Sequence, residues 1–407
     1  MDTFEKLRIL ADAAKYDNAC TSCGSYRDSA DGMIGRTMGG CLVHTYLADG
    51  RSISLLKVLM NNHCIYDCKY CVNRSSNDPP RAAFTPKELA DLTVSFYERN
   101  YIEGLFLSSG VLKSPDYTME MLLKTLLLIR EEYHFHGYIH VKAIPNADQA
   151  LLNAVGLAAD RISVNIELPN SEGYKTIARQ KNKKNIITPM HTIKNLIREY
   201  NADGFPKRFA RSGQTTQMMV GTMRETDKTI ITLSEALYRT FEMRRVYYSA
   251  FSPVQVCDCL PDERTPDWRA RRLYQADMLI KQYQIGADEI LPEDTDLDRD
   301  IDPKSAMALN NIGLFPVELN TADYETLIRI PGIGTASAAK IIKTRRERKI
   351  TFEMLKPLGI SLKRSVYFFT ADGKYYGGKM LESPHLRGRL AADTARGQKN
   401  YEQICVW

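Results

Sequence analysis

The sequence has no long uninterrupted apolar run and few cysteines for its length. None of its apolar stretches approaches the ~18 residues of a membrane-spanning helix, and Met1 to Arg8 form no apolar signal segment. We therefore expect a cytoplasmic protein with no membrane partner. Nine cysteines in 407 residues are too few for a disulfide scaffold. Their local clustering instead indicates metal ligation in a reducing compartment.

The chain is long enough for two or three domains and a large core. Its net charge of +6 is unevenly distributed along the sequence. From Asn320 to Trp407 there are 16 lysines and arginines against 8 acidic residues, whereas the 319 residues before them carry 39 against 41. The basic character therefore lies at the C-terminal end, where it favours a polyanionic partner.

Short apolar runs rich in β-branched and aromatic residues alternate with longer helical patterns. Strands are expected at Ser54–Met60, Gly104–Ser108, Gly137–Lys142, Arg161–Ile166, Thr216–Val220 and Arg245–Ser249. Helices are expected between them, at Pro86–Asn100, Thr118–Glu132, Asp148–Leu157, Pro189–Tyr200 and Asp227–Met243. The first helix begins with the capping-box pattern Thr85-Pro86-Lys87-Glu88. About six such units predict an α/β fold with a parallel sheet, whose chemistry lies on loops after the strands.

Three cysteines directly follow the first expected strand. Cys64, Cys68 and Cys71 have the spacing C-x3-C-x2-C, and Tyr70 precedes the third. A [4Fe–4S] cluster normally takes four thiolates, so three would leave one iron open to another ligand. The alternatives are a structural zinc site or three unrelated buried thiols. Zinc knuckles usually carry paired C-x2-C motifs, and no matching second pair follows downstream.

This cysteine segment resembles that of the radical S-adenosylmethionine (radical SAM) superfamily. In that family the open iron binds the amino and carboxylate groups of S-adenosylmethionine, and one electron from the cluster splits the sulfonium to give a 5′-deoxyadenosyl radical. The resemblance implies two cofactors, a [4Fe–4S] cluster and S-adenosylmethionine, and an electron donor such as flavodoxin or ferredoxin. It also implies a partial (β/α)6 TIM-like barrel over residues 50–286.

The same resemblance implies cofactor contacts at Tyr70, Ser108, Ser109, Gly110, Asn165, Glu167, Arg179 and Gly221. Ser108 to Gly110 stand where many members carry a Gly-Gly-Glu segment whose backbone binds the methionine amino group, but Val111 replaces the glutamate. Glu167 would accept from ribose hydroxyls, and Arg179 would bind the methionine carboxylate. Gly221 would lie in the segment that runs beside the adenine, where glycine permits close approach of the backbone. Each segment is also compatible with an ordinary strand-end loop.

A second motif occupies residues 319–342. Pro331-Gly332-Ile333-Gly334 separates two helical patterns, the first capped by Asn320 or Thr321 and the second beginning at Thr335. This closely resembles a helix-hairpin-helix motif, in which converging backbone N–H groups at a helix N-terminus favour phosphate. The expected nucleic-acid contacts, which read the backbone rather than the bases, are Gly332, Ile333, Gly334, Thr335, Lys340, Lys343 and Arg346. A protein-packing module is the alternative, and residues 355–364 form a candidate degenerate second copy.

Six other cysteines are Cys20, Cys23, Cys41, Cys257, Cys259 and Cys405. The first three could hold an auxiliary cluster or zinc with a fourth ligand such as His44, Cys257 or Cys259, although no familiar auxiliary spacing is matched. Ordinary thiols are the alternative, and we expect Cys405 to be one. The basic segment Lys175 to Lys184 is either a solvated face or, beside a barrel mouth, a surface that steers a polyanion.

A radical SAM barrel joined to a C-terminal helix-hairpin-helix resembles the DNA modification/repair radical SAM proteins linked with uracil-DNA glycosylase-like partners. This resemblance implies an enzyme that binds DNA through its tail and presents an unstacked nucleotide to the barrel. The alternative enzymatic function is modification of RNA, such as tRNA. The alternative without catalysis is an iron–sulfur DNA-binding scaffold or redox sensor. The expected organisation is an N-terminal cysteine-containing segment (1–49), the barrel (50–286), a linker (287–318) and a small all-α helix-hairpin-helix region (319–407).

Overall fold

The computed structural model describes residues 1–14, 41–46, 52–202, 205, 208–254, 257–291 and 295–394. The chain forms two compact units. One comprises Met1–Glu225 and Leu237–Thr265, and the other comprises Thr226–Ala236 and Pro266–Trp407. Cys20, Cys23 and Cys405, which the sequence analysis considered, lie outside the described residues.

A seven-stranded sheet forms the centre of the first unit, and its strands follow one another in chain order. The six parallel strands are β2 (Ser52–Leu59), β3 (Gly104–Ser108), β4 (Tyr138–Lys142), β5 (Arg161–Ser163), β6 (Gln214–Val220) and β7 (Arg245–Ala250). A further strand, β1 (Leu42–Tyr46), pairs antiparallel with β2 at the edge. The predicted partial (β/α)6 half-barrel is therefore confirmed, with one edge strand that was not predicted.

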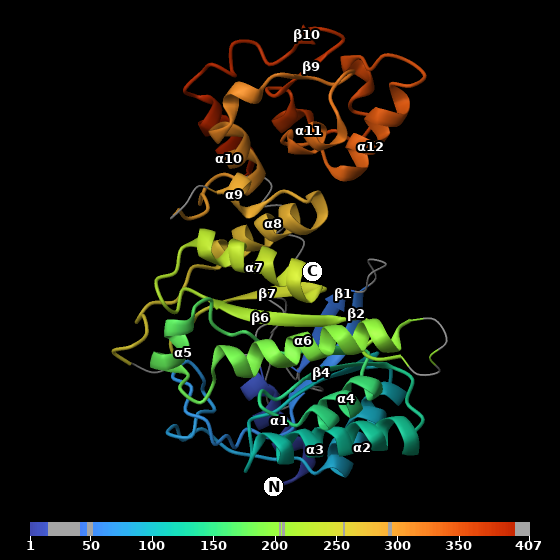
Figure 1. The fold of residues 1–407 in the computed structure, drawn as a ribbon, viewed down its shortest axis with the longest axis vertical. Helices are drawn as coiled ribbons and strands as arrows, with labels where there is room; N and C mark the ends of the chain where they lie inside the picture. Colours follow the sequence, from blue (N-terminus) through green and yellow to red (C-terminus); the bar gives the residue numbers. More distant parts are fainter. Residues whose placement is uncertain are drawn as a thin grey trace, which may run out of the picture. The chain divides into compact units, whose positions relative to one another are not determined.

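Helices connect successive strands and pack beside one another along the sheet (Figure 1). They are α2 (Pro86–Glu98), α3 (Pro115–Leu127), α4 (Gln149–Ala158) and α6 (Lys183–Tyr200), and a π-helix at Leu128–Glu132 continues α3. The capping box forms as expected. The Thr85 side chain accepts from the Glu88 N–H group at 3.2 Å, and the Glu88 carboxylate accepts from the Thr85 N–H group at 2.8 Å.

Some elements differ from the sequence prediction. β5 ends at Ser163 rather than Ile166, because the Ile166 N–H group donates to the Thr216 side chain at 2.9 Å instead of to a strand carbonyl. α6 begins at Lys183 rather than Pro189, because the Asn182 side chain caps it by accepting from Asn185 N–H at 2.8 Å. α1 (Thr3–Ala14) and α5 (Ser171–Ile177) were not predicted.

The second unit is mainly helical. Its helices are α8 (Asp267–Tyr283), α9 (Ala287–Ile290), α10 (Pro303–Asn310), α11 (Tyr324–Arg329), α12 (Thr335–Thr344) and α13 (Leu362–Ser365), with 3-10 turns at Ile312–Leu314 and Phe352–Met354. It also contains a small sheet of β8 (Val317–Glu318), β9 (Phe369–Ala371) and β10 (Lys374–Tyr375). The prediction of an all-α region was therefore wrong in this respect. Pairing of β8 with β9 joins residues too far apart in the chain for a local pattern to reveal.

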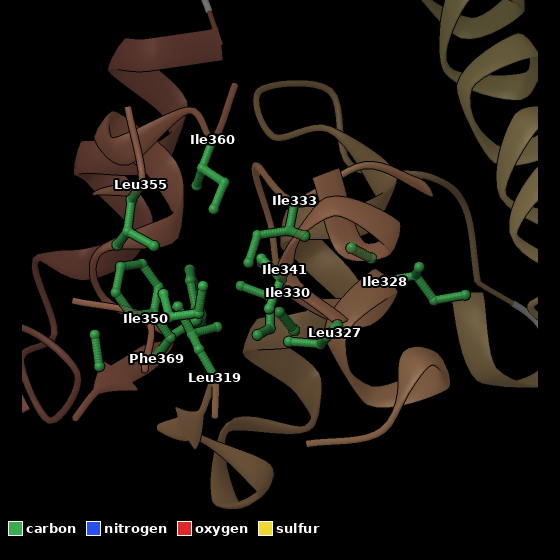
Figure 2. Packing of buried hydrophobic residues seen from close by; sticks show 14 of the residues in the cluster. Leu319, Leu327, Ile328, Ile330, Ile333, Ile341, Ile350, Leu355, Ile360 and Phe369 are labelled. Atoms are coloured by element: carbon green, nitrogen blue, oxygen red, sulfur yellow. The ribbon is translucent and has the colours of Figure 1, made fainter. Parts of the chain in front are cut away.

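One hydrophobic cluster forms the core of the second unit. It contains Ile301 and Ala308 as well as the hairpin side chains Leu327, Ile333 and Ile341. Figure 2 shows Ile330, Ile333 and Ile341 gathered together, with Ile350 and Leu355 in the same cluster. The helix-hairpin-helix segment therefore shares its core with residues that precede it.

α7 (Asp227–Phe241) contributes residues to both units, because the division falls between Ala236 and Leu237. Among the described residues, no helix combines the length and the apolar character needed to cross a bilayer.

Candidate functional site

The cysteine loop, defined here as Asn62 to Asn77, follows β2 at the carboxyl edge of the sheet. A single side chain holds its two ends together. The Arg81 guanidinium donates to the carbonyl oxygen of Asn62 and, at 2.9, 2.8 and 2.6 Å, to those of Asn73, Arg74 and Asn77. Since Asn62 precedes Cys64 and Asn73 follows Cys71, this clamp fixes the segment that carries all three cysteines.

The three thiols of this loop lie in a partly buried environment. Cys64 Sγ accepts from the backbone N–H groups of Tyr66 and Val111, each at 3.4 Å. Burial raises the pKa of Cys68, and it raises that of Cys71 to about 12. A metal that binds here must therefore displace thiol protons.

Iron suits these donors. Among the described residues, no three Cys, His, Asp or Glu side chains already converge as a formed metal site. One clamped loop nevertheless carries three free thiols, and backbone N–H groups already point at one of the sulfurs. This donor chemistry fits an iron–sulfur cluster, and the cluster stays a prediction.

The Ser108 to Gly110 segment, at the end of β3, packs directly against the cysteine loop. Gly110 N–H donates to the Asn61 carbonyl at 2.8 Å, and the Asn61 side chain donates to Ser109 Oγ at 2.5 Å. A Cβ atom at Gly110 would lie only 2.9 Å from the His63 carbonyl oxygen and 3.3 Å from Cys64 Cβ. Glycine is thus required for this contact with the loop, and its cofactor role stays a prediction.

Glu167 combines burial, backbone strain and charge. It is 8% exposed and has φ of 60°, a left-handed conformation that non-glycine residues rarely adopt. Two hydrogen bonds to β6 hold it there, from its N–H group to the Gln217 carbonyl at 2.9 Å and from Met219 N–H to its carbonyl at 2.8 Å. The neighbouring Asn165 amide donates to the Gln217 side chain at 3.4 Å.

Two lysines pair with the Glu167 carboxylate, Lys181 at 3.4 Å and Lys142 at 3.8 Å. Lys181 also donates to the Tyr70 hydroxyl at 3.3 Å, so it links Glu167 to the cysteine loop. Burial lowers the pKa of Lys181, but Tyr70, Glu167 and a cysteine thiol together hold it well above the ordinary value. Arg179, by contrast, is exposed on the turn after α5. The structure thus brings Lys142 and Lys181 to Glu167, and a contact of Arg179 with the methionine carboxylate stays a prediction.

Gly221 adopts φ of 86°, which favours glycine. A Cβ atom there would collide with Thr265 Oγ1, which donates to the Val220 carbonyl at 2.9 Å. The Glu225 carboxylate accepts from the N–H groups of Gly221 and, at 2.8 Å, Met223. Packing against Thr265 therefore accounts for this glycine, and a contact with adenine stays a prediction.

A row of polar and aromatic side chains crosses the sheet below these loops. Lys57, Phe106, His140 and Arg161 are in register on successive strands. The Phe106 and His140 rings stack with centroids 4.2 Å apart, and His140 Nε2 lies 3.1 Å from Ser163 Oγ. Lys142 is two residues beyond His140, so both side chains lie on the sheet face that reaches Glu167.

Neither this row nor the contact of Lys181 with Glu167 was predicted from the sequence. The signal was present, because Lys57, His140 and Lys142 are polar residues at alternate positions in strands expected to be apolar. Lys181 was considered only as part of a basic segment.

The second site is the hairpin between α11 and α12. Gly332 has φ of 85°, and Ile333 N–H donates to the Ile330 carbonyl at 3.1 Å, which closes the turn. α12 begins at Thr335, and its N-cap residue, Gly334, provides no side-chain cap, so the first-turn N–H groups are available to an anion. Thr335 is the first residue of that turn.

The cap of α11 differs from the prediction. The Asp323 side chain accepts from Thr326 N–H at 2.8 Å, so neither Asn320 nor Thr321 is the cap. Asn320 instead exchanges two hydrogen bonds with the backbone of Ile350, at 2.8 and 3.1 Å. An aspartate is an equally good capping residue, and only the position was misread.

The expected second copy repeats the hairpin backbone. Gly359 has φ of 83°, close to that of Gly332, and Ile360 is buried like Ile333. The two hairpins touch, since Ser361 N–H donates to the Gly332 carbonyl at 3.3 Å. The copy is degenerate because α13, which follows it, has only four residues.

The basic residues expected at the nucleic-acid site, Lys340, Lys343 and Arg346, are exposed on or just after α12. Arg345 lies between them but points elsewhere, donating to the carbonyl oxygens of Leu319, at 3.0 Å, and Ala322. The hairpin thus offers free N–H groups followed by solvent-facing cations.

The structure describes three of the remaining cysteines. Cys257 and Cys259 form a disulfide, and Cys41 is buried at the start of the β1 region. In this state neither Cys257 nor Cys259 is free to act as the fourth ligand of a second metal site.

A family model described as "Helix-hairpin-helix motif" matches residues 316–359. The similar solved structures include the FeFe-hydrogenase maturase HydG from Carboxydothermus hydrogenoformans, with 16% identity over 56% of this chain and 51% of that chain and a TM-score of 0.43. A second HydG structure, a maturase of the [FeFe]-hydrogenase, shows 14% identity over 55% and 48% of the two chains, with a TM-score of 0.42. The cobalamin-dependent S-adenosylmethionine radical enzyme OxsB shows 12% identity over 72% and 46%, with a TM-score of 0.34.

The chain spans about half the length of these solved proteins. No curated protein matches it in sequence. The matched motif and the strand topology together define a chain with a parallel α/β half-barrel and a C-terminal helix-hairpin-helix region.

Proposed function

We propose that the protein is a radical SAM iron–sulfur enzyme that modifies or repairs DNA. The observation that carries this proposal is the position of the cysteine loop at the carboxyl edge of the parallel half-barrel. There it contacts Gly110 on one side and, through Tyr70 and Lys181, the buried Glu167 on the other. Sites in parallel barrels lie at this edge, where loops from several strands meet.

In this proposal, Cys64, Cys68 and Cys71 hold a [4Fe–4S] cluster, and the neighbouring strand ends hold S-adenosylmethionine. When bound, this pair supplies one-electron chemistry that side chains alone do not provide. Glu167 orients the ribose hydroxyls, and Lys181 neutralises the carboxylates around it. A nucleotide drawn from its stack would be received at this edge of the sheet.

The hairpin is proposed to bind the sugar–phosphate backbone. The free N–H groups at the start of α12 receive one phosphate, and Lys340, Lys343 and Arg346 neutralise its neighbours. Such contacts supply affinity without base selection. A flavodoxin or ferredoxin as electron donor and a uracil-DNA glycosylase-like partner belong to the same proposal.

Anaerobic reconstitution with iron and sulfide tests the enzyme. The reduced protein is expected to convert S-adenosylmethionine to 5′-deoxyadenosine, measured by chromatography. Cys68→Ala should lose both bound iron and cleavage, whereas Cys405→Ala, the control at the cysteine expected to be an ordinary thiol, should retain both. If Cys68→Ala cleaved S-adenosylmethionine at the wild-type rate, the assignment of Cys68 as a cluster ligand would be wrong.

The polymer is tested separately. Labelled DNA and RNA of the same sequence are incubated with the reconstituted protein, and the nucleosides are analysed by mass spectrometry. A modified deoxynucleoside is the expected result, and modification of structured RNA alone would favour the RNA alternative. Gly334→Ala should weaken DNA binding, because the added methyl group blocks the close approach of a phosphate. The fold should stay intact, since the new Cβ would meet only Tyr283 Oη, at 3.4 Å.

A further inference from the structure

Lys304 is buried beside the hairpin and has no part in the function described so far. It belongs to the first turn of α10 and is 9% exposed. Its Nζ donates to the Ile333 carbonyl at 2.5 Å and lies 4.7 Å from the centre of the Tyr283 ring. The Ile333 carbonyl belongs to the peptide that leads into Gly334, the N-cap residue of α12, which provides no side-chain cap.

A positive charge is unfavourable at this position. Burial removes water from the ammonium group, and the nearby N-terminus of α10 repels it. The facing groups compensate only in part: Tyr283 of α8 offers its ring, and the Asp302 carboxylate already pairs with Arg364 at 3.4 Å and lies near Arg272. Burial consequently lowers the pKa of Lys304 to about 7, in spite of Asp302.

The geometry of the peptide gives this lysine a route to the ligand. In a planar trans peptide the C=O and N–H bonds point in opposite directions. Because Lys304 binds the Ile333 carbonyl, the Gly334 N–H group of the same peptide points away from the lysine. A hydrogen bond to the carbonyl also polarises the amide and makes its N–H group a stronger donor.

We propose that Lys304 is a positioning residue of the nucleic-acid site, which fixes and polarises the Ile333–Gly334 peptide so that its N–H group binds a backbone phosphate. The inference rests on the proposed function of the hairpin. A bound phosphate stabilises the ammonium form of Lys304, so binding above pH 7 takes up a proton. Affinity therefore falls as the pH rises from about 7, since the free protein has lost the charge that the complex requires.

Lys304→Met tests this role, because methionine fills similar volume without charge. Binding of the full-length protein to a labelled DNA duplex is measured by fluorescence anisotropy from pH 6 to 9 at constant ionic strength. We expect roughly tenfold weaker binding at pH 6, from loss of a charge-assisted hydrogen bond. The wild-type and variant curves should converge near pH 9. Their difference separates the effect of Lys304 from the effects of other titrating groups.

Two controls separate this role from a structural one. Lys343→Met, at an exposed position on α12, should weaken binding but keep the pH dependence. Thermal unfolding of Lys304→Met should match or exceed that of the wild type, since an unfavourable buried charge is gone.

Wild-type affinity of Lys304→Met at every pH would overturn the inference. So would a loss of affinity that parallels a loss of thermal stability and leaves the pH dependence unchanged. If the variant does not fold, titration calorimetry of DNA binding by the wild type, in buffers of different ionisation enthalpy, measures the protons taken up on binding. Absence of proton uptake at pH 8 would overturn the inference. Wild-type DNA affinity in Gly334→Ala would instead contradict the proposed phosphate-binding function of the hairpin.

Discussion

Glu167 is a residue at which strain and buried charge coincide. Its left-handed backbone is held by two hydrogen bonds to β6, and its carboxylate is the shared partner of Lys142 and Lys181. Backbone strain of this kind costs about 1–3 kcal/mol and is found mainly at functional sites. The residue therefore has a structural reason and a chemical reason to be sensitive to change.

Glu167→Gln keeps the shape of this side chain but removes its charge. We expect iron content to stay unchanged and affinity for S-adenosylmethionine to fall about tenfold to a hundredfold, as for loss of a charge-assisted hydrogen bond. Equilibrium dialysis of the reconstituted protein measures this. Glu172→Gln, which breaks only an exposed pair with Lys175, is the matched control and should bind normally. Equal affinities in both variants would place the cofactor elsewhere.

Arg81 gives a second prediction at this scale. Arg81→Ala leaves four carbonyl oxygens of the cysteine loop without their shared donor, so we expect a loss of roughly 2–3 kcal/mol in the free energy of unfolding. Reconstituted iron should also be released faster. Urea unfolding and iron release to a chelator measure the two effects. Arg99→Ala, an exposed arginine after α2, should change stability by less than about 0.5 kcal/mol.

The sequence identified the cysteines of the site better than its cations. A motif such as C-x3-C-x2-C is local, so spacing alone locates Cys64, Cys68 and Cys71. Lys181 reaches Glu167 only because the turn after α5 folds back, and spacing holds no record of that contact. Arg179 is exposed, and its predicted contact with the methionine carboxylate stays a prediction.

Among the elements, the two hairpin glycines have different physical roles. Gly332 has a positive φ, and a Cβ atom there would lie 2.7 Å from the Ser361 carbonyl oxygen of the second hairpin. Gly334 has φ of −92°, which any residue adopts. One glycine is required by the fold, and the other leaves room for a ligand.

Gly332→Ala should therefore lower stability by about 1–3 kcal/mol, because it combines an unfavourable backbone conformation with a steric clash. Thermal unfolding followed by circular dichroism measures the change. Gly334→Ala, in the same hairpin, should unfold at nearly the wild-type temperature. Equal destabilisation by both substitutions would contradict the assignment of separate roles.

Prediction of the elements succeeded where the signal was local. Six parallel strands and the capping box of α2 follow from alternation and from side chains next to one another in the chain. β1 and the pairing of β8 with β9 were missed because they depend on partners distant in sequence. The cap of α6 at Asn182 was overlooked in favour of Pro189, since proline often marks a helix start.

At the scale of the whole molecule, the excess of positive charge lies in the C-terminal part, from Asn320 to Trp407. If this part binds the DNA backbone, Lys343→Glu and Arg346→Glu should each weaken binding by the same factor for DNA duplexes of unrelated sequence. Each lost phosphate contact should reduce the log–log salt slope by about 0.9 on duplex DNA. Anisotropy over a salt series measures both quantities. Lys175→Glu, on the exposed surface of α5, is the matched control. A larger effect from Lys175 would move the binding surface to the first unit.

These tests use full-length variants, because the hydrophobic cluster that contains the hairpin also contains Ile301 and Ala308. A truncation at Asn320 would divide this cluster and expose its remaining apolar side chains. Loss of DNA binding by such a fragment would then report unfolding as well as loss of contacts.

The chain passes between the two units after Glu225, after Ala236 and after Thr265. Within the second unit, Asp227 accepts from Arg269 at 2.7 Å, and Lys228 donates to the Leu291 carbonyl at 2.9 Å. A gene fragment that begins at Pro266 therefore lacks a segment that the unit uses. Recombination at a single point between Ala236 and Pro266 would separate residues 226–236 from the rest of the second unit, so it cannot transfer this unit intact to another protein.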